Sequence, residues 1–543
     1  MELGSWAKPV NNRKRKAVDD TDFAIENVMN EGDTLDCDTK HIKTPKINII
    51  TKNVAAAFDR TSTSSRSAEI ILSALIVDKH LKHEDKSCYA IKATFNPNVP
   101  ITLHWDGKLL PDGNGSRVER LPVVVTGAGV SKILDIPVLS SGTADAQTEV
   151  IHQTVQEWDL VDNIAAMSFD TTSVNSGVKN GIIVQLPKIM NKPLLALACR
   201  KHVSELILKA IYEVNGGKAK SSQLDDFLEF KKKFKEIDQE DFQTYADLTV
   251  TNPKDMTWRN DVLNFCLSHL NEKQTRGDYE ELLELTVIFL GGKPRKGIRF
   301  RKPGCLSRAR WMARAIYSMK MFMLKGFHKY MADLSFLTHL ENVTLFIAQF
   351  YVRFWFQTAN APAAPRLDLS LFKDISAFHD DKYINAARKT IKNHLWYLSQ
   401  VNVALAFFDP GVDAEEKTEM VRALKHHSTR TKHSKMTSSY KASQINDNST
   451  LKDFIGAETS CFFEILKLNR SFMDTTTPAE WSTNPEYQEA AERVKGLNVV
   501  NDVAERAVKL ITDYHDKITT DSEQQQYLTQ VIEWHRQRHP LKK

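Results

Sequence analysis

The sequence contains few cysteines, no long apolar run and little net charge. Its six cysteines are scattered over 543 residues without a Cys-x-x-Cys pair, which indicates a reducing, intracellular compartment. The first residues are polar and lack the apolar segment of a secretory signal. No apolar run reaches the roughly 18 residues that span a bilayer, since even the aromatic-rich Val343–Phe356 contains Arg353. We therefore expect a protein without membrane contact.

The positive charge is unevenly distributed, although the net charge of +5 is small for this length. Between Lys293 and Lys325 stand eleven basic residues and no acidic one, and Arg422–Lys441 also lacks acidic residues. One-signed segments of this kind are typical of surfaces that bind phosphate. A solvated surface loop is the alternative, above all for the second segment.

The amino-terminal part is predicted to lack a fold of its own. Residues 1–60 are polar and without hydrophobic periodicity, which is typical of disorder. They contain the basic cluster Arg13-Lys14-Arg15-Lys16, and we therefore expect nuclear localisation. Residues 61–100 form a lead-in with one short helix near Ser67–Lys82, its apolar face marked by Ile70, Leu72, Leu75 and Ile76.

Residues 101–215 alternate between short apolar runs and amphipathic segments, which predict five strands and three helices. Three strands followed by alternating helices and strands is the element order of an RNase H-like α/β core, with three antiparallel strands first and parallel additions after. The expected strands are Ile101–Leu110, Leu121–Thr126, Lys132–Leu139, Ile164–Phe169 and Leu194–Ala198, and the expected helices are Thr143–Leu160, Lys179–Met190 and Arg200–Val214.

Residues 216–490 show helical periodicity and no strand-like runs, so we predict a large all-α insertion that interrupts the core. Residues 491–543 are expected to supply C-terminal helices, Asn498–His515 and Ser522–His539, that complete the core. The helices expected in the insertion are Asp261–Leu270, Tyr279–Leu290, Ala309–Leu324, Leu340–Trp355 and Leu451–Leu468.

Two aspartates stand where an RNase H-like sheet carries metal ligands. Asp106 lies on the first expected strand, and Asp170 directly follows the fourth. Cleavage of a phosphodiester by two metal ions needs clustered carboxylates that hold the ions about 3.5–4 Å apart. A lone Asp before Thr or Gly more often closes an Asx-turn, but two of them at these topological positions favour a metal site.

Four short motifs resemble the hAT superfamily of DNA transposases, in the family's order and at its approximate spacing from Ile101 to the C-terminus. They are Asp170-Thr171-Thr172-Ser173-Val174-Asn175, Cys199-Arg200-Lys201-His202, Arg310-Trp311 and Asn501-Asp502-Val503-Ala504-Glu505-Arg506. The chain departs from the family where Thr171 replaces the Asn that usually follows the aspartate, and Cys37 and Cys88 cannot form its BED-type zinc finger.

The resemblance implies a metal-dependent transposase that cleaves and joins DNA with Mg²⁺ or Mn²⁺. Asp106, Asp170 and Glu505 are then the catalytic metal ligands. Cys199 and His202 are too few for a tetrahedral zinc site, and the resemblance instead implies that they support the strand beside the active site.

The resemblance also implies DNA and a second copy of the chain as partners. Trp311 is expected to stack on an unpaired base, although a Trp on an amphipathic helix is often a core residue. The residues expected to hold DNA are Lys302, Arg308, Arg310, Trp311 and Arg314, and the apolar faces expected to support a homo-oligomer contain Leu510, Ile511, Leu528 and Ile532.

Two other functions are compatible with the sequence. The first is a domesticated, transposase-derived nuclear factor that binds DNA or partner proteins without catalysis. The second is a helical scaffold whose β-region is unrelated to nucleases, which leaves the positions of Asp106 and Asp170 unexplained.

Overall fold

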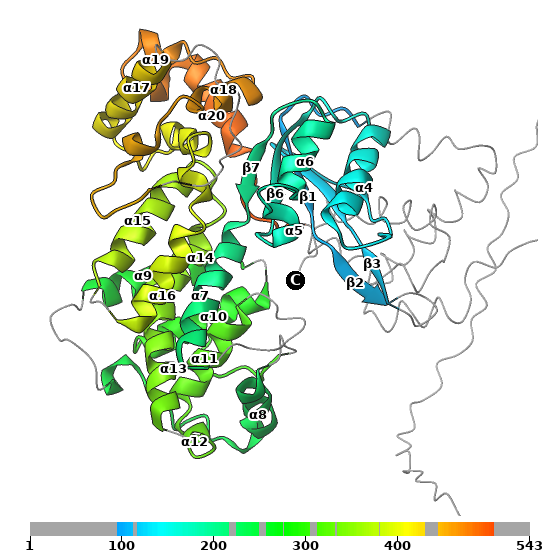
Figure 1. Ribbon diagram of the computed structural model, residues 1–543. Coiled ribbons are helices and arrows are strands. Elements are labelled where there is room, and N and C mark those ends of the chain that lie inside the picture. The colour runs from blue at the N-terminus through cyan, green and yellow to red at the C-terminus, as the bar shows by residue number, and fades with distance from the viewer. Residues whose placement is uncertain are drawn as a thin grey trace, which may run out of the picture. The chain divides into compact units, whose positions relative to one another are not determined.

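The computed structural model describes most of the chain between Phe95 and Val503 (Figure 1). The predictions for residues 1–60, for the helix near Ser67–Lys82 and for the C-terminal helices beyond Val503 lie outside the described residues. The described ranges are 95–111, 117–216, 224–248, 257–274, 276–304, 312–331, 334–378, 381–428, 442 and 444–503.

A mixed five-stranded sheet is built from residues 101–198. Its strands lie in the order β5-β4-β1-β6-β7. The first three in the sequence are antiparallel, and β6 and β7 run parallel to β1. Every residue of β1, β6 and β7 is buried, as expected for strands covered on both faces. The strands are β1 (Ile101–Trp105), β4 (Val123–Gly127), β5 (Val130–Asp135), β6 (Ile164–Phe169) and β7 (Leu195–Ala198).

The first predicted strand, Ile101–Leu110, is interrupted after Trp105, which corrects the prediction of one continuous strand. The chain resumes as a hairpin of β2 (Lys108–Pro111) and β3 (Arg117–Arg120). Trp105 pairs with Val123 in the ladder of β1 and β4, and Lys108 pairs with Arg120 in the ladder of β2 and β3. The two ladders keep the same register, which places Asp106 opposite Pro122. Proline has no N–H to donate to a ladder, and it therefore opens the sheet at the position of Asp106.

Two predicted helices pack beside the sheet, α4 (Ala144–Glu157) and α6 (Ile182–Ile189), and Figure 1 shows them next to each other. The Thr143 side chain accepts a hydrogen bond from Ala146 N and caps α4, as the sequence predicts. The predicted helix Lys179–Met190 is shorter at its start, because residues 178–180 form a turn and α6 begins at Ile182. A separate short helix, α5 (Ser173–Ser176), precedes this turn.

The remaining described residues form helices, so the prediction of an α/β part combined with a helical part is confirmed. Among the described residues from 224 to 498, β-pairing is limited to one isolated bridge between Phe242 and Leu324. The predicted helix Leu340–Trp355 contains one π-turn, Ile347–Tyr351, and Leu451–Leu468 is broken near Gly456. The helices are α7 (Arg200–Gly216), α8 (Asp225–Lys233), α9 (Thr257–Asn271), α10 (Gly277–Phe289), α11 (Ala313–Met323), α12 (Lys325–His328), α13 (Leu334–Phe346), α14 (Val352–Gln357), α15 (Ala364–Ser376), α16 (Lys382–Lys392), α17 (Ala414–Ser428), α18 (Thr459–Ile465), α19 (Phe472–Thr475) and α20 (Pro485–Lys495).

The helical part covers the edge strand β7. The Tyr397 hydroxyl donates to Ala198 O at 2.7 Å, and Asn402 Nδ2 donates to Ala196 O at 2.9 Å. These side chains satisfy carbonyls that an edge strand otherwise leaves open to another chain. At the start of α7, Arg200 donates two hydrogen bonds to Asp368 Oδ1, at 2.7 and 3.2 Å, and a third to Thr358 O. A buried ion pair therefore fixes the sheet to the helices.

In the part of the chain that the structure describes, every helix is too short or too polar to cross a bilayer.

Candidate active site

Asp106 and Asp170 lie side by side where β1 and β6 end. His104 pairs with Ser168 in the parallel ladder, and each aspartate stands two residues further along its strand. Neighbouring strands are about 5 Å apart, which sets the separation of the two backbones. Both side chains line one cavity of about 300 Å³. The structure therefore brings together two of the three carboxylates that the sequence assigns to the candidate site.

The Asp170 carboxylate uses one oxygen for local structure and leaves the other available. Oδ1 accepts hydrogen bonds from Thr172 N at 3.2 Å, Thr172 Oγ1 at 2.7 Å and Asn175 Nδ2 at 2.5 Å. This is the Asx-turn that the sequence also allowed. Among the described residues, none donates to Oδ2, so the turn does not exhaust the carboxylate.

Asn175 connects the two strand ends. Its Oδ1 accepts a hydrogen bond from Trp105 Nε1 at 2.8 Å, while its Nδ2 donates to Asp170. The Trp105 ring stacks on Phe169, with centroids 6.0 Å apart. The residues directly before both aspartates are thus packed together, which holds the carboxylates in a fixed relation.

Asp106 is paired with a lysine of the β2–β3 hairpin. Lys108 Nζ lies 2.5 Å from Asp106 Oδ2, and their side chains are 15% and 16% exposed. A cation therefore already sits against this carboxylate, in a cavity that Lys108 also lines. Any other cation that binds Asp106 has to share or displace the ammonium group.

Helix α7 contributes His202 and Glu205 to the cavity, and Cys199 stands directly before the helix. Burial raises the pKa of the Cys199 thiol to about 11, so it is a protonated, structural thiol at neutral pH. Burial also lowers the pKa of His202, against the opposing pull of the Asp170 and Asp106 carboxylates. The imidazole is therefore neutral near pH 7, and the positions of Cys199 and His202 agree with a supporting role.

Glu205 is a cavity residue that the sequence interpretation missed. Its Oε1 accepts hydrogen bonds from Met312 N at 2.9 Å and from the Tyr351 hydroxyl at 2.5 Å, and burial raises its pKa. It stands three residues after His202, a helical spacing that places both on one face. That spacing is the signal by which the sequence could have identified it.

Asn501 brings the end of the described chain to the same cavity. Its Nδ2 donates to Trp105 O at 2.8 Å, its Oδ1 lies 3.1 Å from His104 Nδ1, and its backbone N donates to Cys199 Sγ at 3.2 Å. One residue further, the Asp502 carboxylate lies 3.5 Å from Lys201 Nζ. Residues nearly 400 positions apart are thus held at one end of the sheet.

Much of the positive charge counted between Lys293 and Lys325 is paired with carboxylates. Of the nine basic residues of this run that the structure describes, five form ion pairs, four of them with glutamates of α10. These five are Lys296, Arg299, Arg301, Lys320 and Lys325. The run is therefore a less continuous basic surface than the sequence alone suggests.

The residues expected to hold DNA are only partly described. Arg314 lines the cavity beside Asp106 and Asp170, and no described residue forms a hydrogen bond with its buried Nε. Lys302 is exposed and does not line the cavity. Arg308, Arg310, Trp311 and Glu505 lie outside the described residues.

The described donor atoms supply only part of a metal site. No cluster of three or more His, Cys, Asp or Glu side chains suited to a metal occurs within the described ranges. Asp106 and Asp170 nevertheless supply oxygen donors of the kind that Mg²⁺ and Mn²⁺ prefer, and the free Oδ2 of Asp170 fits such a role.

No protein-family model matches the chain, and no curated protein matches it at a significant level. The chemistry of the cavity therefore has to carry the functional argument.

Proposed function

We propose that the chain is a hAT-like DNA transposase with an RNase H-like core, in which Asp106, Asp170 and Glu505 bind divalent metal. The observation that carries this proposal is the convergence of Asp106, Asp170 and Asn501 on one cavity. Asn501 begins the motif that contains Glu505.

The order and direction of the strands support the core assignment. Three antiparallel strands come first, and two strands parallel to β1 follow on its other side. The helical part leaves the sheet after β7, and the chain returns to it where Arg200 N donates to Val499 O. This return is what an insertion between two parts of one core requires.

Covalent geometry limits how far Glu505 can lie from the cavity. Asp502 is held by Lys201, and Glu505 follows three residues later. Three residues span at most about 10–11 Å even when fully extended. In this proposal Glu505 is the third carboxylate of the site.

The chain's own residues have distinct tasks in this proposal. The Asp106 and Asp170 carboxylates hold the cations, and Asn175 fixes the orientation of Asp170. Arg314, which lines the cavity, offers its guanidinium group to a phosphate that enters it. Bound Mg²⁺ or Mn²⁺ supplies the acidity that activates water or a 3′-hydroxyl and offsets charge on the phosphate.

The proposal is tested by DNA cleavage with the full chain. Supercoiled plasmid should be nicked or joined with Mg²⁺ or Mn²⁺ and not with EDTA. Asp170→Asn should reduce the rate at least about 100-fold, the order of loss for removing a group that acts in the transition state. The exposed Asp261 of α9 offers a matched control, and Asp261→Asn should keep the wild-type rate. Retention of activity in Asp170→Asn would assign it to a contaminating nuclease.

The Lys108–Asp106 ion pair favours one alternative, a nuclear factor derived from a transposase that binds DNA or proteins without catalysis. In that case the ammonium group replaces the metal permanently. Titration calorimetry with Mn²⁺ separates the two functions, because the non-catalytic factor should release no binding heat and Asp106→Ala should make no difference. Nuclear localisation and dimerisation through the C-terminal helices stay predictions.

A further inference from the structure

Glu205 is a buried carboxylate that the proposed nuclease chemistry does not use. It lies on α7, is 9% exposed and lines the cavity that also contains Asp106 and Asp170. Its Oε1 accepts the hydrogen bonds from Met312 N and from the Tyr351 hydroxyl. Burying a carboxylate is unfavourable unless its oxygens are hydrogen-bonded, so Glu205 and these two donors hold one another in place.

Met312 is the residue at which the chain enters α11. It is buried, and its backbone is in the left-handed region with φ 62°. A residue other than glycine adopts this conformation where its surroundings impose it, often at functional sites. The Met312 side chain has no oxygen that could cap the helix, and the bond from its backbone N to Glu205 therefore fixes the start of α11. A carboxylate at this end of a helix is also favoured by the helix dipole.

The second donor, Tyr351, stands at the end of a π-turn. The helical segment from α13 to α14 is α-helical except at Ile347–Tyr351, where the backbone bonds follow the wider π pattern. Single π-turns within α-helices are frequent at functional sites. The Tyr351 ring is 2% exposed and stacks on Trp355, with centroids 5.7 Å apart, so its hydroxyl is held against Glu205.

Arg314 follows two residues after Met312, in the first turn of α11, and lines the same cavity. Its charge acts on Glu205, because the pKa of that carboxyl is raised by burial and lowered in part by Arg314. The two lysines of the lining, Lys108 and Lys209, are each ion-paired with a carboxylate, whereas none of the described carboxylates forms an ion pair with Arg314. The start of α11 thus decides where this guanidinium group lies in the cavity.

We propose that Glu205 is a positioning residue for DNA binding. By holding Met312 N it sets where α11 begins, and it thereby keeps Arg314 where a DNA phosphate meets the two aspartates. This inference rests on the proposed function, because that function brings DNA to the cavity. It predicts an effect opposite to that of simple electrostatics, since removal of a carboxylate near DNA ordinarily strengthens phosphate binding, whereas removal of Glu205 should weaken it.

The test is the salt dependence of DNA binding by the full chain. Fluorescence anisotropy of a labelled duplex in EDTA gives Kd at several salt concentrations, and each phosphate contact adds about 0.9 to the slope of log Kd against log salt. Arg314→Met should lower this slope by about 0.9 and raise Kd at least about tenfold, the order for one charged hydrogen bond. Glu205→Leu should do the same, and the double variant should lose no more than either single one.

Two further variants separate positioning from a general effect on the fold. Glu205→Gln keeps an oxygen that can accept both hydrogen bonds, so it should retain the wild-type slope. Glu341→Leu is the matched control, because Glu341 of α13 is equally buried, at 8% exposure, and lies outside the cavity lining. A variant that is merely less stable contains less active protein, which leaves the slope unchanged.

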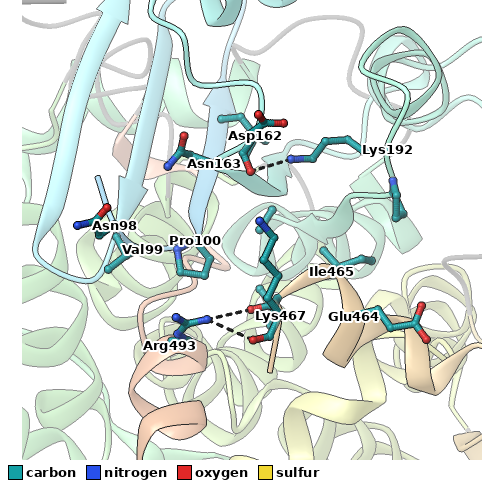
Figure 2. Close-up of a pocket in the computed structure, with 14 residues that line it drawn as sticks. Asn98, Val99, Pro100, Asp162, Asn163, Lys192, Glu464, Ile465, Lys467 and Arg493 are labelled. Carbon is teal, nitrogen blue, oxygen red and sulfur yellow. Dashed lines mark hydrogen bonds between the residues drawn. The ribbon is translucent and has the colours of Figure 1, made fainter. Parts of the chain in front are cut away.

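The control for the loss of an arginine is Arg493→Met. Arg493 is also half-buried, but it lines a different cavity, at the opposite ends of the parallel strands. Figure 2 shows it there, with Nη1 donating to Leu466 O and Lys467 O. This variant should keep the wild-type Kd and slope.

Should Glu205→Leu fail to fold, Tyr351→Phe decides, because it removes only one of the two donors. It should raise Kd and lower the slope in the wild-type chain and have no further effect in Arg314→Met. A wild-type slope in Tyr351→Phe would then overturn the proposal.

Four other outcomes also overturn it. They are a wild-type slope in folded Glu205→Leu, a wild-type slope in Arg314→Met, losses that add in the double variant, and a full chain that does not bind DNA. Loss of metal-dependent cleavage in Glu205→Gln with normal DNA binding would make Glu205 a metal ligand, and this too contradicts a positioning role. A chain that shows the expected slopes but does not cleave DNA refutes the nuclease function alone.

Discussion

Replacing Asn501 by alanine should detach the segment that precedes Glu505 from the sheet. The Asn501 side chain is 5% exposed and links two residues of β1, His104 and Trp105, across nearly 400 positions of sequence. Alanine removes both side-chain contacts and leaves the backbone hydrogen bond to Cys199.

The expected cost follows from these contacts. Each hydrogen bond contributes about 1 kcal/mol net, and a buried partner left without a bond costs about 1–3 kcal/mol. His104 keeps its contact with Thr126 Oγ1 at 2.8 Å, so losing the bond to Asn501 should cost this histidine no more than about 1 kcal/mol. We therefore expect Asn501→Ala to lower the free energy of unfolding by about 2–4 kcal/mol, in keeping with the loss of two buried bonds.

Urea unfolding of the full chain, followed by tryptophan fluorescence, measures this loss. Hydrogen exchange should show that residues 499–503 open first. Asn498→Ala is the matched control, because its side chain accepts only a local bond from Val500 N at 3.1 Å, and it should cost less than about 1 kcal/mol. The Asn501 variant should also bind Mn²⁺ more weakly. A change below about 0.5 kcal/mol in Asn501→Ala, within the scatter of surface substitutions, would refute the reasoning.

Two further predictions concern the helical part. Asp368→Ala leaves the Arg200 guanidinium, which is 1% exposed, without its carboxylate. Urea unfolding should show that the free energy of unfolding falls by about 3–5 kcal/mol. A decrease below about 1 kcal/mol, typical of surface ion pairs, would contradict a buried pair. The pKa of His339 is lowered to about 4, chiefly by burial, so its neutral form is favoured in the fold. The free energy of unfolding therefore has its full value above the unfolded pKa of about 6.5. It decreases by up to about 3 kcal/mol as the pH falls towards 4, because the unfolded chain takes up the proton first. His339→Gln should flatten unfolding profiles between these pH values, and an unchanged slope would exclude His339 as the cause.

The sequence predicted the sheet well, because its strongest signals are local. Ile164–Phe169 is an uninterrupted run of apolar and small residues, and it forms a strand with those bounds. Asp106, on the first predicted strand, and Asp170, directly after the fourth, then become neighbours as soon as those strands pair. The order of the strands is enough to bring the two aspartates together, and the alternation of strands and helices in the sequence indicates that order.

The features that the sequence could not predict depend on tertiary contacts. The basic run between Lys293 and Lys325 looked one-signed because its partners, including Glu280 and Glu284, belong to an earlier helix. The break at Asp106 depends on Pro122, which faces it only after the ladder forms. Asn501 begins one of the four motifs, but no feature of the neighbouring sequence indicates that its side chain contacts His104.

The central claim is tested most directly by diffraction from crystals of the full chain soaked in Mn²⁺. We expect an anomalous peak between the Asp106 and Asp170 carboxylates, with Lys108 Nζ moved away from Asp106 and the Glu505 carboxylate as a further ligand. A cavity without that peak, or a Glu505 carboxylate directed away from it, would exclude the proposed metal site.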